Sequence, residues 1–217
     1  SVPGNFAQFN TYGEAYKFVF HDTEEQGLSF NDDAKVYVNG TEITSGFEVV
    51  FPAAHEEDDD TFDVVFADLT KIPDLKAGDV ITVEYTSTLT ESAVLGKQGN
   101  VNTVYGEYSN LHRPEYPGFT PEDSVIAFTY KVIVNKVDEN NAPLAGAKFT
   151  LEKYDVATKT WKPISQVETT ADTTFTFNGL DDGKYRLTET ATPAGYNSIK
   201  PIEFTVTAEH DILWETQ

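Results

Sequence analysis

Bulky apolar residues alternate with polar residues along much of this chain, which is the spacing of β-strands with one buried face. The run YKFVF at 16–20, the run KVYV at 35–38 and the run VITVEYT at 80–86 show the alternation clearly. No segment of useful length has a helical period, so the pattern predicts an all-β fold. Further strands are expected at 41–44, 47–51, 62–66, 101–108, 125–137, 147–153, 173–177, 184–190 and 202–206.

Turn signals organise these strands. Asn39-Gly40 separates two alternating segments, and this pair predicts a tight hairpin because both turn residues need a positive φ. The run FEVVF at 47–51 recurs as FDVVF at 62–66, which predicts two paired strands joined by an acidic loop. Residues 111–124 are rich in proline and predict a loop before a domain boundary. We therefore expect two tandem immunoglobulin-like β-sandwiches, residues 1–129 and 130–217.

The composition narrows the classes of function. The 217 residues contain 36 acids and 15 bases, for a net charge of −21. This charge disfavours binding to nucleic acids and anionic membranes, because nothing neutralises their phosphates. Cysteine is absent, which excludes disulfides and thiolate metal sites. Methionine is absent even at position 1, so we expect a mature piece or a fragment of a longer protein.

Candidate chemistry follows from strand parity. Lys136 would share one strand face with two valines, and Glu189 would share one with a tyrosine and a leucine. An uncharged amine is a nucleophile, and a protonated carboxyl group can polarise a carbonyl. In the alternative interpretation, both side chains lie at strand ends and reach solvent. Asp22 likewise shares a face with Phe18 and Phe20, although it is equally placed to cap a turn before Thr23.

Three segments of the second half match a known family in order. They are KVD at 136–138, PLAGAKFTL at 143–151 and GLDDGKYRLTETATPAGY at 179–196. Together they resemble the CnaB-type (SpaA-like) domain of Gram-positive pilins and surface adhesins. The resemblance implies that Lys136 forms an intramolecular isopeptide bond with a last-strand Asn or Asp, catalysed by Glu189. We expect residues 130–217 to lack that last strand and its acceptor asparagine, because Asn178 and Asn197 sit in predicted turns.

The first half resembles the CnaA-like middle domain of backbone pilins. The matching runs are FHDT at 20–23, GLSF at 27–30, GNVNTVY at 99–105 and EYSN at 107–110. By this resemblance Asn110 is the acceptor of a second isopeptide bond and Asp22 is its assisting acid. The family's reactive lysine lies on an upstream strand, so we expect it to precede Ser1 and to be absent from this chain.

These resemblances imply a structural shaft subunit of a sortase-assembled pilus, extracellular and anchored to a Gram-positive cell wall. The expected partners are neighbouring pilin subunits, a class C sortase and a host surface. No enzyme activity on an external substrate and no cofactor are expected. The alternatives are a surface adhesin or tip pilin that binds host glycan or matrix protein, and a glycan-active enzyme with two acids in a cleft.

A metal site is not expected from the sequence. The acidic run at 56–60 has the oxygen ligands that Ca²⁺ prefers, but it lacks the spacing and the interrupting glycine, which favours a solvated loop. His21, His55, His112 and His210 are scattered without the paired spacing of zinc ligands.

Overall fold

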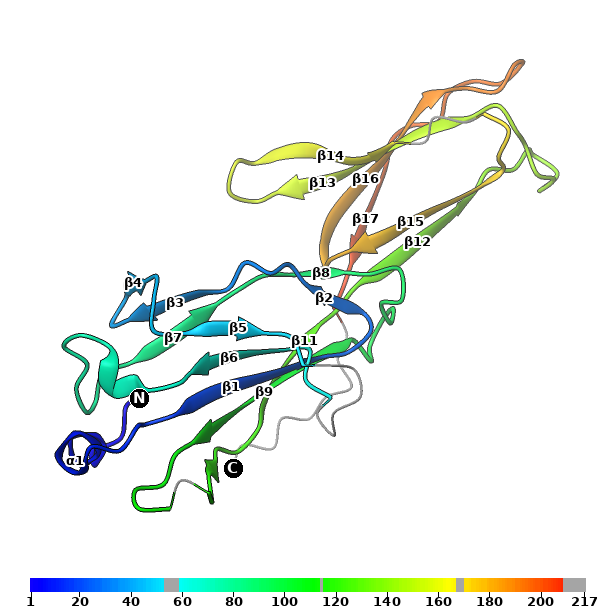
Figure 1. Ribbon diagram of the computed structural model, residues 1–217. Coiled ribbons are helices and arrows are strands. Elements are labelled where there is room, and N and C mark those ends of the chain that lie inside the picture. The colour runs from blue at the N-terminus through cyan, green and yellow to red at the C-terminus, as the bar shows by residue number, and fades with distance from the viewer. Residues whose placement is uncertain (53–58, 114, 167–169, 209–217) are drawn as a thin grey trace. The chain divides into compact units, whose positions relative to one another are not determined.

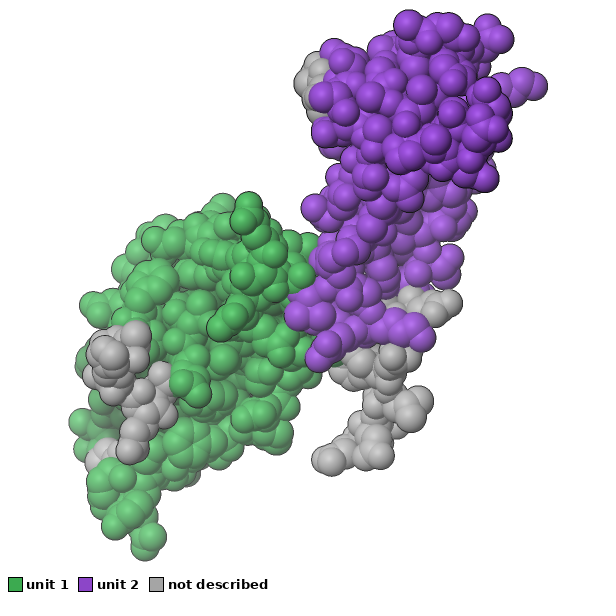
Figure 2. Space-filling model, turned by 90° about the vertical axis from the view of Figure 1, so that its right-hand side faces the viewer, with its two compact units in different colours: residues 1–93, 100–127 green, residues 94–99, 128–217 purple. Residues whose placement is uncertain are grey.

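The computed structural model describes residues 1–52, 59–113, 115–166 and 170–208. Their contacts divide the chain into two compact units, which Figure 2 colours separately. The first unit is 1–93 with 100–127, and the second is 94–99 with 128–217. Strands make up nearly all of the regular structure, so the expected all-β class is confirmed. Among the described residues, no helix is long and apolar enough to cross a membrane.

The first unit contains a large antiparallel sheet in the order β10-β9-β1-β6-β5, with β11 also paired to β9 (Figure 1). Register pairs place Phe18 opposite Phe66 on one side of β1 and opposite Tyr108 on the other. The strands are β1 (Phe18–Glu24), β5 (Glu48–Val50), β6 (Phe62–Phe66), β9 (Asn100–Tyr108), β10 (Gly118–Phe119) and β11 (Asp123–Ala127).

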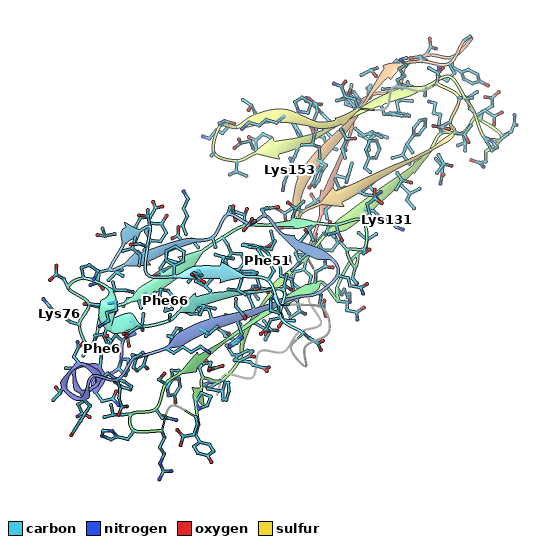
Figure 3. The ribbon with its side chains drawn as sticks, viewed as in Figure 1. Phe6, Phe51, Phe66, Lys76, Lys131 and Lys153 are labelled. Carbon is cyan, nitrogen blue, oxygen red and sulfur yellow. The ribbon has the colours of Figure 1, made fainter. Side chains whose placement is uncertain are left out.

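A second layer completes this unit. It consists of β4 (Thr41–Ile43), β3 (Lys35–Val38) and β7 (Ile81–Glu84) in one sheet, and β2 (Leu28–Phe30) with β8 (Ser87–Leu89) in another. The core between the layers includes Val36 from β3 and Phe62, Val64 and Phe66 from β6, all almost fully buried. Figure 3 shows the Phe66 side chain within this unit. Alternating apolar residues on both layers therefore make the sandwich that the sequence predicted.

The expected hairpin and strand pair are both confirmed. β3 pairs with β4, and Asn39 and Gly40 between them have φ values of 48° and 79°. β5 pairs antiparallel with β6, as the repeated FEVVF and FDVVF runs indicated. Residues 53–58 of the connecting acidic loop lie outside the described residues.

One short helix was not predicted. Helix α1 (Phe6–Tyr12) buries Phe6 and Phe9, and both rings meet Tyr16 edge-on. Gly13 ends the helix with a φ of 70°, in the left-handed conformation that glycine favours. Seven residues hold only two apolar positions of a helical stripe, which is too short a pattern to distinguish from a loop. A single 3₁₀ turn, η1 (Leu69–Lys71), buries Leu69 in the same core.

The second unit is a smaller sandwich. β12 (Tyr130–Asn135) pairs with β15 (Thr174–Leu180), and the other sheet has the order β14-β13-β16-β17. The latter strands are β13 (Lys148–Asp155), β14 (Thr160–Gln166), β16 (Gly183–Ala191) and β17 (Ile202–Val206). Its core includes Phe149 and Leu151 from β13, Phe175 from β15 and Leu187 from β16.

The boundary between units differs slightly from the predicted division at 129/130. Contacts divide the chain at 127/128 and also group residues 94–99 with the second unit. One of these contacts is the hydrogen bond that the Gly96 N–H donates to the Thr129 carbonyl over 2.8 Å. Residues 94–99 carry no periodic signal in the sequence, because a single turn has no repeating pattern.

We predict that Leu151→Ala selectively destabilises the second unit. Leu151 is fully buried, so its truncation leaves a cavity and lowers the free energy of unfolding by about 2–5 kcal/mol. Urea unfolding followed by the NMR signals of β13 and β16 amides reports on the second unit, to which both strands belong. The control Val156→Ala, at a side chain that is 78% exposed, should change the midpoint little. Equal shifts for both variants would contradict this core assignment.

Candidate functional site

The second unit holds a buried lysine and a buried glutamate that contact each other. Lys136 Nζ lies 3.1 Å from Glu189 Oε1, and their side chains are 11% and 0% exposed. Lys136 follows β12, whose residues Val132 and Val134 pack against the core. Glu189 lies on the face of β16 that also buries Tyr185 and Leu187. Of the two interpretations that strand parity left open, the structure agrees with the one in which both side chains point inward.

Backbone contacts hold both residues in place. The Lys136 N–H donates to the Thr173 carbonyl over 2.8 Å, which fixes the chain just beyond β12. Glu189 is the register partner of Phe149, and its Oε2 accepts a hydrogen bond of 2.9 Å from the Ile199 N–H. Its Oε1 has no partner in hydrogen-bond geometry among the described residues, because Lys136 approaches it only as an ion pair. One carboxylate oxygen is thus anchored and the other faces the amine.

The two asparagines considered as acceptors in this unit lie away from the buried pair. Asn178 and Asn197 are both exposed, which fits the expectation that neither reaches the buried amine. Residues 209–217, where the chain continues past β17, lie outside the described residues. A buried lysine and glutamate lose the hydration of two charged groups, and their mutual attraction offsets only part of that cost. Such a pair is therefore a better indication of chemistry than of added stability.

The first unit holds a second buried acid, Asp22, on the inner face of β1. Tyr85 Oη donates to Asp22 Oδ2 over 2.5 Å, and Asn102 Nδ2 lies 3.1 Å from the same oxygen and 2.6 Å from the Tyr85 hydroxyl. Asp22 and Asn102 are both buried, and Oδ1 of each has no hydrogen-bond partner among the described residues. The cluster thus contains an acid, an amide and two unused buried oxygen atoms.

Burial raises the pKa of the Asp22 carboxyl, while its hydrogen bonds from Tyr85 and Asn102 act in the opposite direction. Burial, with help from the Asp22 hydrogen bond, also raises the pKa of Tyr85. The phenol therefore stays protonated at neutral pH and remains a donor to Asp22. A carboxyl group that holds its proton more readily is suited to give it to a nearby carbonyl oxygen.

Asn110, the predicted acceptor, lies elsewhere. It is exposed, it lies two residues beyond the end of β9, and its amide donates to the Tyr116 carbonyl over 2.6 Å. The register pairs Asp22 with Val104, so Asn102 is the diagonal neighbour of Asp22 and Asn110 lies six residues from the paired position. The structure therefore does not bring Asn110 to Asp22 and brings Asn102 instead. Parity along β9 marks Asn102 as inward-facing, but only the register with β1 identifies its partner.

The acidic run at 56–60 and the four histidines, which the sequence analysis considered as metal ligands, lie only partly within the described residues. His55, His210 and three residues of the acidic run, 56–58, lie outside the described residues. His112 is an exposed partner of Glu14, with Nδ1 2.8 Å from Oε1. His21 is buried and lies beside Asp60, the last residue of the acidic run, at 2.8 Å.

Comparisons with known proteins agree with this architecture. Residues 130–217 match the family described as SpaA, a prealbumin-like fold domain. The C-terminal fragment of the major pilin GBS80 of Streptococcus agalactiae has a TM-score of 0.67 at 21% identity, covering 95% of this chain and 82% of that one. The full-length major pilin RrgB of Streptococcus pneumoniae has a TM-score of 0.60 at 15% identity, with coverages of 89% and 62%.

A curated relative extends the match across both units. The trypsin-resistant surface T6 protein of Streptococcus pyogenes serotype M6 is 25% identical over 203 residues, which is 87% of this chain. The chain therefore resembles major pilins of Gram-positive bacteria in fold, and its residues 130–217 are similar to the SpaA prealbumin-like domain. It spans about a third of the T6 protein's length.

We predict that Asp22 makes stability depend on pH in one direction. Burial raises the pKa of Asp22 in the folded state. Its contribution to the free energy of unfolding is therefore fully present below its unfolded pKa and is lost as the pH rises through its folded pKa. Asp22→Asn removes this titration, so the variant should gain stability relative to the wild type between about pH 4 and pH 7. Urea unfolding at several pH values, followed by NMR signals of β1 amides, measures the difference. A constant difference across that range would contradict the assignment.

Proposed function

We propose that this chain is part of the shaft subunit of a sortase-assembled pilus, and that each unit is closed by a self-catalysed isopeptide bond. In this proposal Lys136 and Glu189 are the nucleophile and acid of the second unit. Asn102 and Asp22 are the acceptor and acid of the first, with Asn102 in place of Asn110. The protein is exposed outside a Gram-positive cell and anchored to its wall. Its partners are neighbouring pilin subunits, joined by a class C sortase.

The observation that carries the proposal is the complementarity of the two buried sites. The second unit holds an amine beside an acid, with Glu189 Oε1 lacking a hydrogen-bond partner among the described residues. The first unit holds an amide beside an acid, with Oδ1 of both Asp22 and Asn102 lacking one. Among the described residues, each site therefore has two of the three groups needed for a lysine–asparagine bond, and the third group differs between the two sites.

An apolar groove in the first unit fits a lysine-bearing strand. Its volume is about 470 Å³, and Ser1 and Val2 line it together with Phe18 and Phe20. Phe18 and Phe20 share the inner face of β1 with Asp22, so a segment joined to Ser1 and lying along the groove would extend toward the buried acid. We propose that this segment supplies the lysine and that a strand beyond β17 supplies the acceptor for Lys136.

The bond-forming step requires no external reagent. The uncharged lysine amine attacks the side-chain amide carbon of asparagine, a new C–N bond forms, and the old C–N bond breaks with release of ammonia. The acid protonates the carbonyl oxygen as the amine attacks, and it passes the proton lost by the amine to the departing NH2 group, which leaves as ammonia. The oxygen returns its proton to the acid as the carbonyl re-forms. Each acid thus acts once, within its own chain.

The expected benefit is mechanical and thermodynamic. A covalent link between the first and last strands closes a loop of most of a domain. By analogy with a disulfide across a loop of about 100 residues, it restricts the unfolded chain and contributes on the order of 4–5 kcal/mol. The amide is not reducible, which suits a shaft built from a chain without cysteine. Force along the shaft would pass through covalent bonds instead of opening strand pairs.

An adhesin or tip pilin that binds a host glycan or matrix protein is the alternative function. It is distinguished by binding: a shaft subunit polymerises with its own kind, whereas an adhesin captures host ligand as a monomer.

We predict that the protein, expressed with its natural flanking sequence on both sides, has an intact mass lower than its sequence mass by two molecules of ammonia. Lys136→Ala and Glu189→Ala should each have an intact mass only one ammonia below the sequence mass of the variant, because either change prevents the bond in the second unit. Asn102→Ala and Asp22→Ala should each show the same deficit of one ammonia, because either change prevents the bond in the first unit. High-resolution mass spectrometry of the purified protein measures all four.

Matched controls separate chemistry from damage to the fold. Lys131→Ala removes an exposed lysine on β12, marked in Figure 3, and should leave both bonds intact. Asn110→Ala tests the originally predicted acceptor, and it too should leave both bonds. Loss of a bond in Asn110→Ala but not in Asn102→Ala would overturn the assignment of Asn102. A wild-type mass equal to the sequence mass would overturn the isopeptide proposal.

A further inference from the structure

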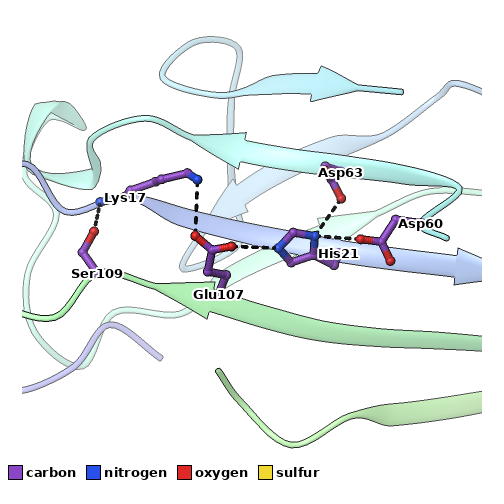
Figure 4. Close-up of polar contacts among 6 residues, drawn as sticks. All are labelled: Lys17, His21, Asp60, Asp63, Glu107 and Ser109. Carbon is purple, nitrogen blue, oxygen red and sulfur yellow. Dashed lines mark hydrogen bonds and ion pairs between the residues drawn. The ribbon is translucent and has the colours of Figure 1, made fainter. Parts of the chain in front are cut away.

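The outer face of the first unit's large sheet carries a cluster that the isopeptide proposal does not use (Figure 4). β1 lies between β6 and β9, and the register places His21 opposite Asp63 on one side and Tyr105 on the other. The Tyr105 ring stacks on the imidazole with centroids 4.5 Å apart. Asp60, just before β6, reaches the same imidazole. Asp22 points to the opposite face of β1, so the two sites are separate.

Two carboxylates converge on one ring nitrogen of His21. Nδ1 lies 2.8 Å from Asp60 Oδ2 and 3.0 Å from Asp63 Oδ1. The three side chains are 8%, 3% and 12% exposed. A ring nitrogen carries at most one proton, so it can offer a single hydrogen to these two oxygen atoms. Two carboxylates and an imidazole that converge in this way form a ligand set suited to a divalent cation.

The other ring nitrogen has the setting of a metal-binding histidine. Nε2 has no hydrogen-bond partner among the described residues and faces Glu107 Oε2 at 3.5 Å. Glu107 is held from its other oxygen by Lys17 Nζ at 3.3 Å. Metal-binding histidines commonly direct their second N–H to a carboxylate, and carboxylate ligands are commonly hydrogen-bonded themselves. Asp60 meets this condition too, because its Oδ1 accepts from Thr23 Oγ1 over 2.8 Å.

We propose that His21, Asp60 and Asp63 bind one divalent transition-metal ion of the zinc class through Nδ1, Oδ2 and Oδ1. The candidate ligand atoms lie within 4.8 Å of one another. Bonds of about 2.0–2.1 Å in a tetrahedral site separate ligand atoms by about 3.3 Å. The two observed separations at Nδ1 would need to open by only a few tenths of an ångström. Water would take the fourth position.

The imidazole sets the class of ion. Mg²⁺ and Ca²⁺ prefer oxygen ligands alone, whereas an imidazole with carboxylates suits zinc and its neighbours. The strongly acidic chain also raises the local concentration of cations. The bound ion would link β1 to β6 and to the segment that precedes β6. Sequence spacing could not reveal this site, because its histidine and its aspartates are 39 residues or more apart and meet only through strand pairing.

The test is zinc binding by the tag-free chain after treatment with a chelator. Isothermal titration with Zn²⁺ should show one site per chain, and imidazole NMR should show that the His21 signals shift before those of the other histidines. The melting temperature should rise with zinc concentration, because an ion that binds only the folded state stabilises it. Mg²⁺ or Ca²⁺ at the same concentration should not displace the zinc.

Variants distinguish this site from diffuse binding to an acidic surface. His21→Gln should abolish the site, and Glu107→Gln should weaken binding by roughly 10- to 100-fold, since Glu107 orients the ligand without touching the ion. The control is His112→Gln, which removes an exposed histidine paired with a single carboxylate and should leave zinc affinity unchanged.

Three results would overturn the proposal: no one-to-one site, zinc affinity unchanged in His21→Gln, or equal competition by Ca²⁺. If His21→Gln does not fold, the NMR titration of the wild type decides, and a zinc response that omits His21 would refute the site.

Discussion

The buried contact between the Lys136 amine and the Glu189 carboxylate is the constraint around which the second unit is organised. Two ionisable groups inside a small sandwich lose their hydration, and apolar residues of similar size would pack there at less cost. The fold nevertheless orients them toward each other at 3.1 Å and anchors one glutamate oxygen with a backbone N–H. A costly arrangement that is also well supported is typical of a site kept for its chemistry.

The first unit also buries polar groups in contact with each other, but here they are an acid and an amide. Asp22 and Asn102 are both buried, and the Tyr85 hydroxyl is hydrogen-bonded to both. The phenol orients the carboxylate, while Oδ1 of the acid and Oδ1 of the amide have no hydrogen-bond partner among the described residues. In the proposed function, one unit displays the nucleophile with its acid, and the other displays the electrophile with its acid.

Period-two alternation was sufficient to predict the class of fold, the 39–40 hairpin and the inward faces of β12 and β16, because each of these depends on neighbours in sequence. It was not sufficient for helix α1, whose stripe is two residues long, or for β2 and β8, whose three residues each show too little alternation. Site residues divided in the same way. Lys136, Glu189 and Asp22 were found by parity and resemblance, whereas Asn102 required the register between β1 and β9. The cluster at His21 required a third strand as well, so no spacing in the sequence could indicate it.

The central claim is that the Lys136 amine is the nucleophile of a bond assisted by Glu189. Tandem mass spectrometry of protease fragments, from the protein expressed with its natural flanking sequence, tests it most directly. We expect one branched peptide in which the Lys136 side chain is joined to an asparagine beyond β17, and we expect it to be absent from Glu189→Ala. Recovery of Lys136 only in linear peptides from the wild-type protein would contradict the claim.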